Sequence, residues 1–365
     1  MTEALPSTTE IVRLFHHFAT CGNSAHKGDR NLDLLRAVAV LLVLVAHCLP
    51  ASPPQQAAGH YGVLIFFVHT ALVLLLSLKR QMGASSLAFR FYMQRVFRIY
   101  PLSILCVLVT LAFRISWPYP VFTPRSGVSI AANLLLVQNF LHEPFSISSP
   151  LWSLPFELQM YAVLPAVFWL LRRRGMRAAV SLAAVSVALA VAEAATNPFD
   201  GPWITRYVPC FIGGAFAYCA YSSRRRIAWW LWPAVIAGLG VLFVITKPSA
   251  PSDWITCMAL GLLVPVFREV PCGLLSKAAV LVARYSYGIY LSHVPLLWLC
   301  FQRLTILPVA IRWAVFAALM CITPVVLYHL IEEPIIRVGK ALSFRMFPTD
   351  EVDIQTRAKH SLAAS

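Results

Sequence analysis

An arginine and a histidine share one face of the first strongly apolar stretch of the chain. Arg36 and His47 are eleven residues apart, and every residue between them is apolar. Eleven residues make about three helical turns with a rise of about 16 Å, so both side chains point the same way. Ionisable residues inside an apolar helix are costly, which makes both functional candidates. The alternative, a snorkelling arginine and a histidine bonded to a neighbouring helix, explains the shared face less well.

A second basic feature combines arginines with aromatic residues over 90–101. Arg95 and Arg98 are three residues apart, so they are neighbours on a helix. The planar guanidinium suits phosphate, and the pair therefore favours an anion site over a simple membrane anchor. For Arg90 we expect the anchoring role.

A single carboxylate marks the stretch 150–161. Trp152 and Tyr161 are typical of residues at a membrane interface. Glu157 is expected about two helical turns inside the outer end of its span, near the depth of His47. A carboxylate there needs a partner or a proton, so an interfacial role does not account for it.

A fourth polar stretch, 284–295, lies on an otherwise apolar helix. Ser286, Tyr287 and His293 are its candidates. They could line a polar cavity, or they could form hydrogen bonds between helices, and the sequence leaves both open.

Other polar residues are expected to be structural. Core hydrogen bonding is the expected role of His69 and His329, and Glu332 is expected at a solvated helix end. Histidines and carboxylates occur at membrane depth, but their spacing specifies no metal. The nine cysteines form no C-x-x-C pair and are interpreted as small apolar residues.

The elements that position these residues are apolar helices. Of the 365 residues, 59% are hydrophobic and 12% are charged, and the mean hydropathy is +0.71. The composition predicts an all-α integral membrane protein with about ten spans of roughly 20 residues. The candidate spans are 31–49, 59–78, 97–113, 150–171, 178–196, 203–221, 228–246, 254–267, 279–301 and 309–331.

The distribution of basic residues predicts the threading of these spans. With both termini in the cytoplasm, all but six of the 30 lysines and arginines lie on the cytoplasmic side, as the positive-inside rule requires. The six are Arg114, Arg125, Arg206, Lys247, Arg303 and Arg312. If 128–140 also crossed the membrane, every later cluster of basic residues would lie on the outer side. This segment is therefore predicted to be re-entrant or interfacial. The net charge of +15 thus reflects membrane topology, and we expect no nucleic-acid partner.

Taken together, these stretches resemble the membrane acyltransferase-3 family of bacterial O-acyltransferases. Its first-helix Arg, ten residues and His match Arg36 and His47, and its R-x-x-R pair matches Arg95 and Arg98. W-S-L-x-x-E, S-Y-G-I-Y-L-x-H-x-P and E-x-P are found in order further along, ending at Glu332 and Pro334. The family's F-F-V-x-S-G is here F-F-V-H-T-A at 66–71, which puts a role for that Ser-Gly pair in doubt. The fused esterase-like domain of many members is not expected.

The resemblance implies a ten-helix fold that moves an acyl group, commonly acetyl from acetyl-CoA, to a hydroxyl of a carbohydrate or lipid-linked glycan. Arg36, Arg95 and Arg98 would contact the phosphates of the acyl-CoA at the inner face. The thioester would point toward His47, which acts either as a general base or as a covalent acyl carrier, and Glu157 could orient its imidazole. The candidate substrate-binding residues are Trp152, Ser153, Tyr161, Ser286, Tyr287 and His293.

We expect a cytoplasmic segment 1–30, an acyltransferase domain 31–335 and a cytoplasmic tail 336–365, in the inner (cytoplasmic) membrane of a cell. No cleaved signal peptide is expected. The competing class is a transporter or flippase of an anionic or lipid-linked glycan, which ten helices with buried ionisable residues would also suit. A scaffold subunit of a glycan-assembly complex is a third. The acceptor and the acyl chain length are left open by the sequence.

Overall fold

The computed structural model describes residues 29–82, 86–117, 126–141, 146–196, 205–221 and 227–346, and the elements named in these ranges are all helical. This confirms the all-α prediction, and a helix coincides with each of the predicted spans. These helices are α2 Arg30–Cys48, α3 Pro53–Arg80, α4 Leu87–Ala112, α6 Leu154–Arg174, α7 Met176–Thr196, α8 Val208–Ala220, α9 Leu231–Thr246, α10 Ala250–Leu263, α11 Leu274–Trp298 and α12 Val309–Leu327.

Six helical stretches are long and apolar enough to cross a membrane. They are α2, α3, α4, α7, the stretch Ser149–Arg174 that includes α6, and the stretch Val309–Met346 that includes α12. Three further apolar helices, α8, α9 and α10, are shorter. Length and composition thus identify a membrane protein, whereas ten crossings and cytoplasmic termini remain predictions.

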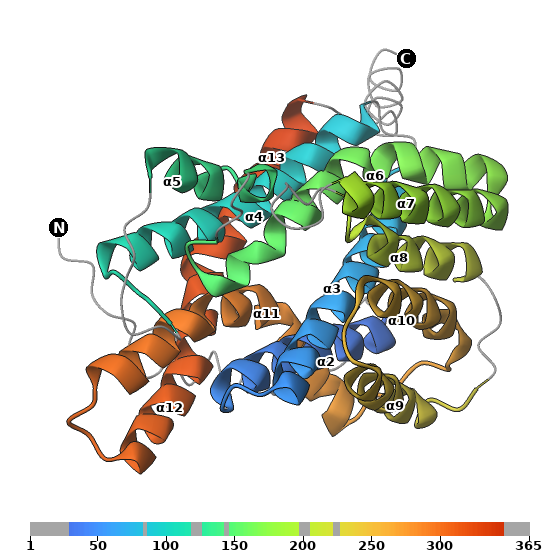
Figure 1. Ribbon diagram of the computed structural model, residues 1–365. Helices are drawn as coiled ribbons and strands as arrows, with labels where there is room; N and C mark the ends of the chain where they lie inside the picture. The colour runs from blue at the N-terminus through green and yellow to red at the C-terminus, as the bar shows by residue number, and fades with distance from the viewer. Residues whose placement is uncertain are drawn as a thin grey trace, which may run out of the picture.

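Helices α2 and α3 run through the middle of the bundle (Figure 1). Helix α2 packs against α3 and α11, and α3 packs against α8, α9 and α10. Helices α4 and α13 pack together on another side of the molecule. The residues expected to do chemistry lie on α2, α4, α6 and α11, so they meet around this centre.

Small residues let the central helices approach closely, as in other membrane bundles. A Cβ on Gly62 would lie 2.7 Å from the carbonyl oxygen of Ala39, and a Cβ on Gly59 would lie 2.8 Å from the Cβ of Ala46. Both contacts hold α3 against α2. The second occurs one residue before His47, so it fixes the position of that histidine.

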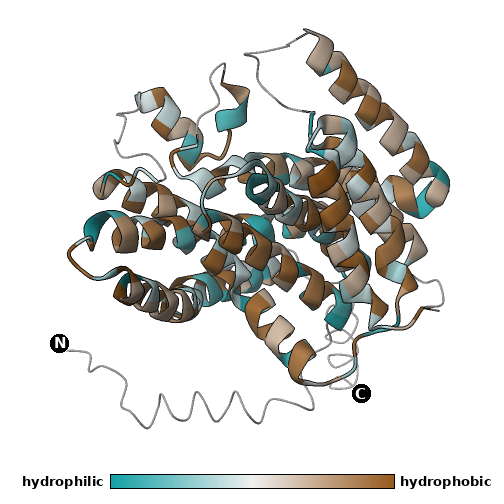
Figure 2. Cartoon of the chain, turned by 60° about the horizontal axis from the view of Figure 1, so that its bottom comes forward, coloured by the Kyte–Doolittle hydropathy of each residue, from teal (hydrophilic) through white to brown (hydrophobic). Residues whose placement is uncertain are grey.

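Apolar side chains cover the outer faces of the helices. Ile245 and Ile255 are 70% and 68% exposed, and Val185 and Val191 on α7 are exposed too. Figure 2 shows hydrophobic residues along the outward surfaces of many helices. In a bilayer these apolar side chains contact lipid instead of water. Apolar outer faces are therefore typical of membrane-spanning helices.

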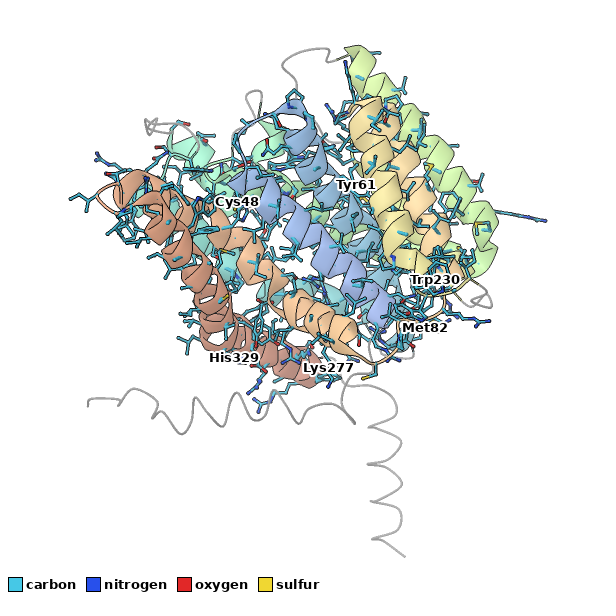
Figure 3. The ribbon with its side chains drawn as sticks, turned by 90° about the horizontal axis from the view of Figure 1, so that it is seen from below. Cys48, Tyr61, Met82, Trp230, Lys277 and His329 are labelled. Carbon is cyan, nitrogen blue, oxygen red and sulfur yellow. The ribbon has the colours of Figure 1, made fainter. Side chains whose placement is uncertain are left out.

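The chain ends of successive helices fall at two opposite sides of the bundle. In Figure 3, Cys48 and Tyr61 lie on one side, whereas Met82, Lys277 and His329 lie on the other. This separation is what alternating spans require. We call the first the Cys48 end and the second the Met82 end; the threading predicts that the Met82 end faces the cytoplasm.

The segment 128–140 is too short to cross. It forms α5 Gly127–Leu134, a helix of 8 residues, followed by a 3₁₀ turn Gln138–Phe140. Eight residues rise about 12 Å, well short of a hydrocarbon core of about 30 Å. Asn133 accepts the backbone N–H of Ile147 and Gln138 donates to the carbonyl of Leu151, which ties the segment to the chain before α6.

The sequence reading missed a helix in the expected tail. Helix α13, Glu333–Met346, follows α12 and packs along α4. A Cβ on Gly339 would lie 2.5 Å from that of Phe97, and the guanidinium of Arg90 lies 4.3 Å from the ring centroid of Phe344. Arg90 is buried by this contact, so it is not a surface anchor. Residues 347–365 of the expected tail, and nearly all of 1–30, lie outside the described residues.

Candidate active site

Three arginines converge on one cavity between α2, α3, α4, α6 and α11, which we call the arginine cavity. Its volume is about 190 Å³. Its polar lining residues are Arg36, His69, Thr70, Arg95, Arg98, Ser153, Glu157, Tyr161, Ser286, Tyr287 and Tyr290. The three arginines expected from their spacing thus meet, together with five of the other predicted residues.

Arg36 and Arg98 are held by partners from the C-terminal half of the chain. The Nε of Arg36 donates to the Oγ of Ser286 at 2.6 Å. An Nη of Arg98 lies 3.5 Å from a carboxylate oxygen of Glu332. Glu332 is 1% exposed, so the expected solvated helix end was wrong. The π-helical turn Tyr328–Glu332 at the end of α12 carries it inward.

Glu157 belongs to the arginine cavity, and its partners there are hydroxyl groups. Thr70 donates to one carboxylate oxygen at 3.0 Å, and Tyr161 donates to the other at 3.4 Å. Thr70 stands where the resembling family often has serine, and the structure gives this threonine a role of its own. Helix α6 begins at Leu154, so Glu157 lies in its first turn, shallower than expected.

The arginine cavity has features that suit an anion. The Nε of Arg95 is buried and has no hydrogen-bond partner among the described residues. Three guanidinium groups face two carboxylates, those of Glu157 and Glu332. Guanidinium groups with unused donors bind phosphate well. These residues therefore fit an anionic group such as a phosphate.

A larger cavity adjoins the arginine cavity toward the Met82 end, and we call it the inner cavity. Its volume is about 680 Å³. Arg36 and Arg98 line both cavities, so the two are neighbours. Arg80 and Arg284 add positive charge to the inner cavity, which Asp29, Asp33 and Glu269 partly balance.

A third cavity lies at the Cys48 end and contains His47; we call it the outer cavity. Its volume is about 500 Å³, and it is lined by α2, α3, Trp152 and Tyr290. The Nδ1 of His47 lies 2.9 Å from the carbonyl oxygen of Val43. A carbonyl only accepts, so Nδ1 carries the hydrogen and Nε2 keeps its lone pair. This nitrogen is the nucleophilic or basic atom of the ring.

His293 is the ring beside His47, at 4.8 Å between centroids and nearly perpendicular to it. It is fully buried, its Nδ1 lies 3.2 Å from the carbonyl oxygen of Ile289, and its Nε2 has no partner among the described residues. His293 is not among the lining residues of the three cavities, and it contacts His47 directly. Glu157, which was expected beside His47, lines the arginine cavity instead. The reason is the 3₁₀ turn Ser149–Trp152, which directs Trp152 to one cavity and the start of α6 to the other.

A hydrogen bond lies at the boundary between the outer cavity and the arginine cavity. The hydroxyls of Ser153 and Tyr290 are 2.8 Å apart. Tyr290 lines both cavities, and Ser153 lines the arginine cavity. The three cavities thus form a series along α2, from Asp33 near its start to His47 near its end.

The outer cavity also contains residues that sequence reasoning missed. His60 lines it, and its Nε2 lies 3.0 Å from a carboxylate oxygen of Asp253 on α10. Trp152 stacks on His60 at 6.0 Å between ring centroids. Both residues of the pair lie in apolar spans or at their edges, which is the signal that could have identified them.

Comparisons with known proteins identify the family of the chain. The model of the acyltransferase 3 family, described as an acyltransferase domain, matches residues 29–329. A protein of Acidianus two-tailed virus, ORF330, provisionally named an acetyltransferase, is 26% identical over 293 residues, which cover 73% of this chain and 82% of that protein. No solved structure gives a significant match.

The chain belongs to the acyltransferase 3 family. By class it is a membrane O-acyltransferase. This confirms the resemblance drawn from the sequence, and it places the chain with enzymes and not with carriers or scaffolds.

Proposed function

We propose that the protein moves an acyl group, most simply acetyl, from cytoplasmic acyl-CoA to a hydroxyl of an extracytoplasmic or lipid-linked carbohydrate. The inner cytoplasmic membrane of a cell is the proposed location. The observation that carries the proposal is the series of cavities along α2, with arginines at one end and His47 at the other.

The donor enters the inner cavity from the Met82 end. Its phosphates contact Arg36, Arg95 and Arg98, whose charges exceed those of the two nearby carboxylates. The thioester arm is long and narrow, and it extends past the pair Ser153 and Tyr290 toward His47. Such positioning converts two mobile reactants into neighbours, which is a major source of rate enhancement.

The acceptor enters the outer cavity from the opposite end. Trp152 offers an aromatic face of the kind on which sugar rings pack, and Gln55 and Gln56 supply amide groups nearby. The hydroxyl of the acceptor then lies in the same space as the Nε2 of His47.

Two roles suit this Nε2. As a general base it takes the proton of the attacking hydroxyl, and as a nucleophile it carries the acyl group between the two half-reactions. In the second role acyl-CoA releases free thiol before any acceptor is present, which gives ping-pong kinetics.

The test is thiol release from acetyl-CoA by purified protein in lipid, with native protein and His47→Ala compared. We expect the native protein to release thiol and the variant to lose nearly all of that activity. Equal rates in a correctly inserted variant would overturn the proposal. Movement of a glycan across sealed vesicles without thiol release would instead support a carrier.

A further inference from the structure

The outer cavity contains a second histidine, and this one has a buried carboxylate partner. The Nε2 of His60 lies 3.0 Å from Oδ2 of Asp253. Asp253 is 1% exposed, and its other oxygen, Oδ1, is buried without a hydrogen-bond partner among the described residues. A carboxylate so placed is costly unless it is paired, and His60 is the partner that the structure shows.

His60 and His47 lie beside the same helix contact. His47 follows Ala46 and His60 follows Gly59, and a Cβ on Gly59 would lie 2.8 Å from the Cβ of Ala46. Both histidines line the outer cavity. The tight crossing of α2 and α3 therefore presents two imidazoles to one space.

The partner of His60 determines which of its nitrogens is free. A carboxylate accepts, so Nε2 donates its hydrogen to Asp253 and the lone pair resides on Nδ1. Nδ1 has no partner among the described residues. An imidazole with a carboxylate behind one nitrogen and a lone pair on the other is the arrangement of a general base, since the carboxylate stabilises the imidazolium that forms.

We propose that His60 deprotonates the acceptor hydroxyl and that Asp253 is its positioning residue. This proposal rests on the proposed function. The acceptor oxygen forms a bond to the acyl carbon as its proton moves to Nδ1 of His60. The bond between the acyl carbon and Nε2 of His47 breaks, and its electrons return to that nitrogen. The imidazolium of His60 then releases the proton to water. His47 is thereby the acyl carrier, and His60 is the general base.

The walls around His60 support this role. Trp152 and Phe243 stack on its ring at 6.0 and 5.9 Å between centroids, and Tyr207 lies at 6.1 Å. Aromatic walls limit the access of water, which would otherwise compete with the acceptor for the acyl group. Arg206 lies over the Tyr207 ring at 5.4 Å, on one of these aromatic walls.

The chain supplies a matched control. His329 forms a histidine–carboxylate pair with Glu333, at 3.1 Å and one turn apart on the same helical stretch, and is not among the lining residues of the three cavities. If the loss of any histidine–carboxylate pair affected the reaction only through stability, His329→Gln would act as His60→Gln does.

The experiment measures two acceptors of different chemistry with radiolabelled acetyl-CoA and protein in lipid. One is the carbohydrate fraction of membranes from cells that make the protein, and the other is hydroxylamine. Hydroxylamine attacks acyl groups without first losing a proton to a base, and its hydroxamate product is measured separately. The proteins compared are native, His60→Gln, Asp253→Asn and His329→Gln.

We expect His60→Gln to lose transfer to carbohydrate by about 100-fold or more, the usual contribution of a general base, while hydroxamate formation stays within about threefold of native. Asp253→Asn should also lose transfer to carbohydrate, by a smaller factor. His329→Gln should match the native rate with both acceptors. Native-like carbohydrate transfer by His60→Gln overturns the proposal, and so does an equal loss toward both acceptors. A native protein that acylates neither acceptor contradicts the proposed function itself.

Discussion

The arginine cavity and the outer cavity are both lined by α2, yet they are built from different chemistry. The arginine cavity, of about 190 Å³, is lined by three guanidinium groups and the carboxylate of Glu157, and Glu332 contacts one of the arginines. The outer cavity has no arginine or lysine among its lining residues and offers histidines, glutamines and a tryptophan. The arginine cavity therefore suits the binding of a charged donor, and the outer cavity suits proton transfer.

The difference shows how a single helix can contribute both to donor binding and to the transfer of the acyl group. The face of α2 that presents Arg36 to one cavity presents His47 to the other, about 16 Å further along by helical rise. Between them, Tyr290 and Ser153 mark the boundary. Variants that change one end should leave the other end intact, and the following predictions use that rule.

The largest effect is expected at the arginine end. Arg36→Met removes a charge-assisted hydrogen bond to Ser286 and a buried positive charge. A hydrogen bond from this guanidinium to a donor phosphate would contribute about 1.5–3 kcal/mol, so its loss should raise the dissociation constant of acetyl-CoA by about 10- to 100-fold. Calorimetric titration measures it. Arg337→Met is the control, because that side chain is 74% exposed and outside the cavities, and it should bind as native does.

At the outer end, Trp152→Ala should affect the acceptor alone. The indole stacks on His60 and lines the cavity, and an aromatic contact is worth about 0.5–1.5 kcal/mol beyond its area. The KM for the carbohydrate acceptor should rise by about tenfold, while the dissociation constant of acetyl-CoA stays unchanged. Steady-state kinetics with each substrate varied in turn would show this. A parallel rise for the donor would remove the distinction between the two ends.

Glu157→Gln tests whether this residue acts on donor binding in the arginine cavity. The amide keeps an oxygen for Thr70 but removes a negative charge that competes with donor phosphates. We expect free coenzyme A to bind a few-fold more tightly, on the order of 1 kcal/mol, with a weaker gain at high salt. Titration at two ionic strengths is the measurement. Unchanged coenzyme A binding combined with an altered hydroxamate rate would instead link Glu157 to His47.

The smallest effect is expected at the boundary. Tyr290→Phe removes one buried hydrogen bond, which is worth about 0.5–1.5 kcal/mol, and leaves the hydroxyl of Ser153 without its partner. Thermal unfolding in detergent should shift down by a few degrees. Hydrolysis of acetyl-CoA in the absence of acceptor should rise slightly, because the cavities are less well separated. A large loss of transfer would mean that Tyr290 takes part in the chemistry.

Much of the fold followed from the sequence because bilayer thickness and charge distribution constrain apolar helices strongly. The marginal span 97–113 extends back to Leu87, since the interleaved arginines and aromatics are helical too. Helix α13 was missed because its polar residues resemble a solvated tail. Its small residues Gly339 and Ser343 are buried against α4, and that partner is visible only in three dimensions.

The site was predictable where a motif kept its residues together. Arg36, Arg95 and Arg98 were expected to meet and do so. Glu157 was expected beside His47, but a short turn before α6 changes which cavity it faces, and turns of this kind leave little trace in hydrophobic patterning. The pair His60 and Asp253 is 193 residues apart, so no local pattern could connect its members.

The most direct test of the account is the dependence of thiol release on acetyl-CoA concentration for native protein, Arg36→Met and His47→Ala, each shown to be inserted and folded. We predict that a high concentration of acetyl-CoA restores most of the activity of Arg36→Met, because its defect lies in donor binding. His47→Ala should stay inactive at every concentration, because its defect lies in the transfer itself. Recovery of His47→Ala at high donor concentration, or failure of Arg36→Met to recover, would contradict the division of the path into a donor end and a reaction end.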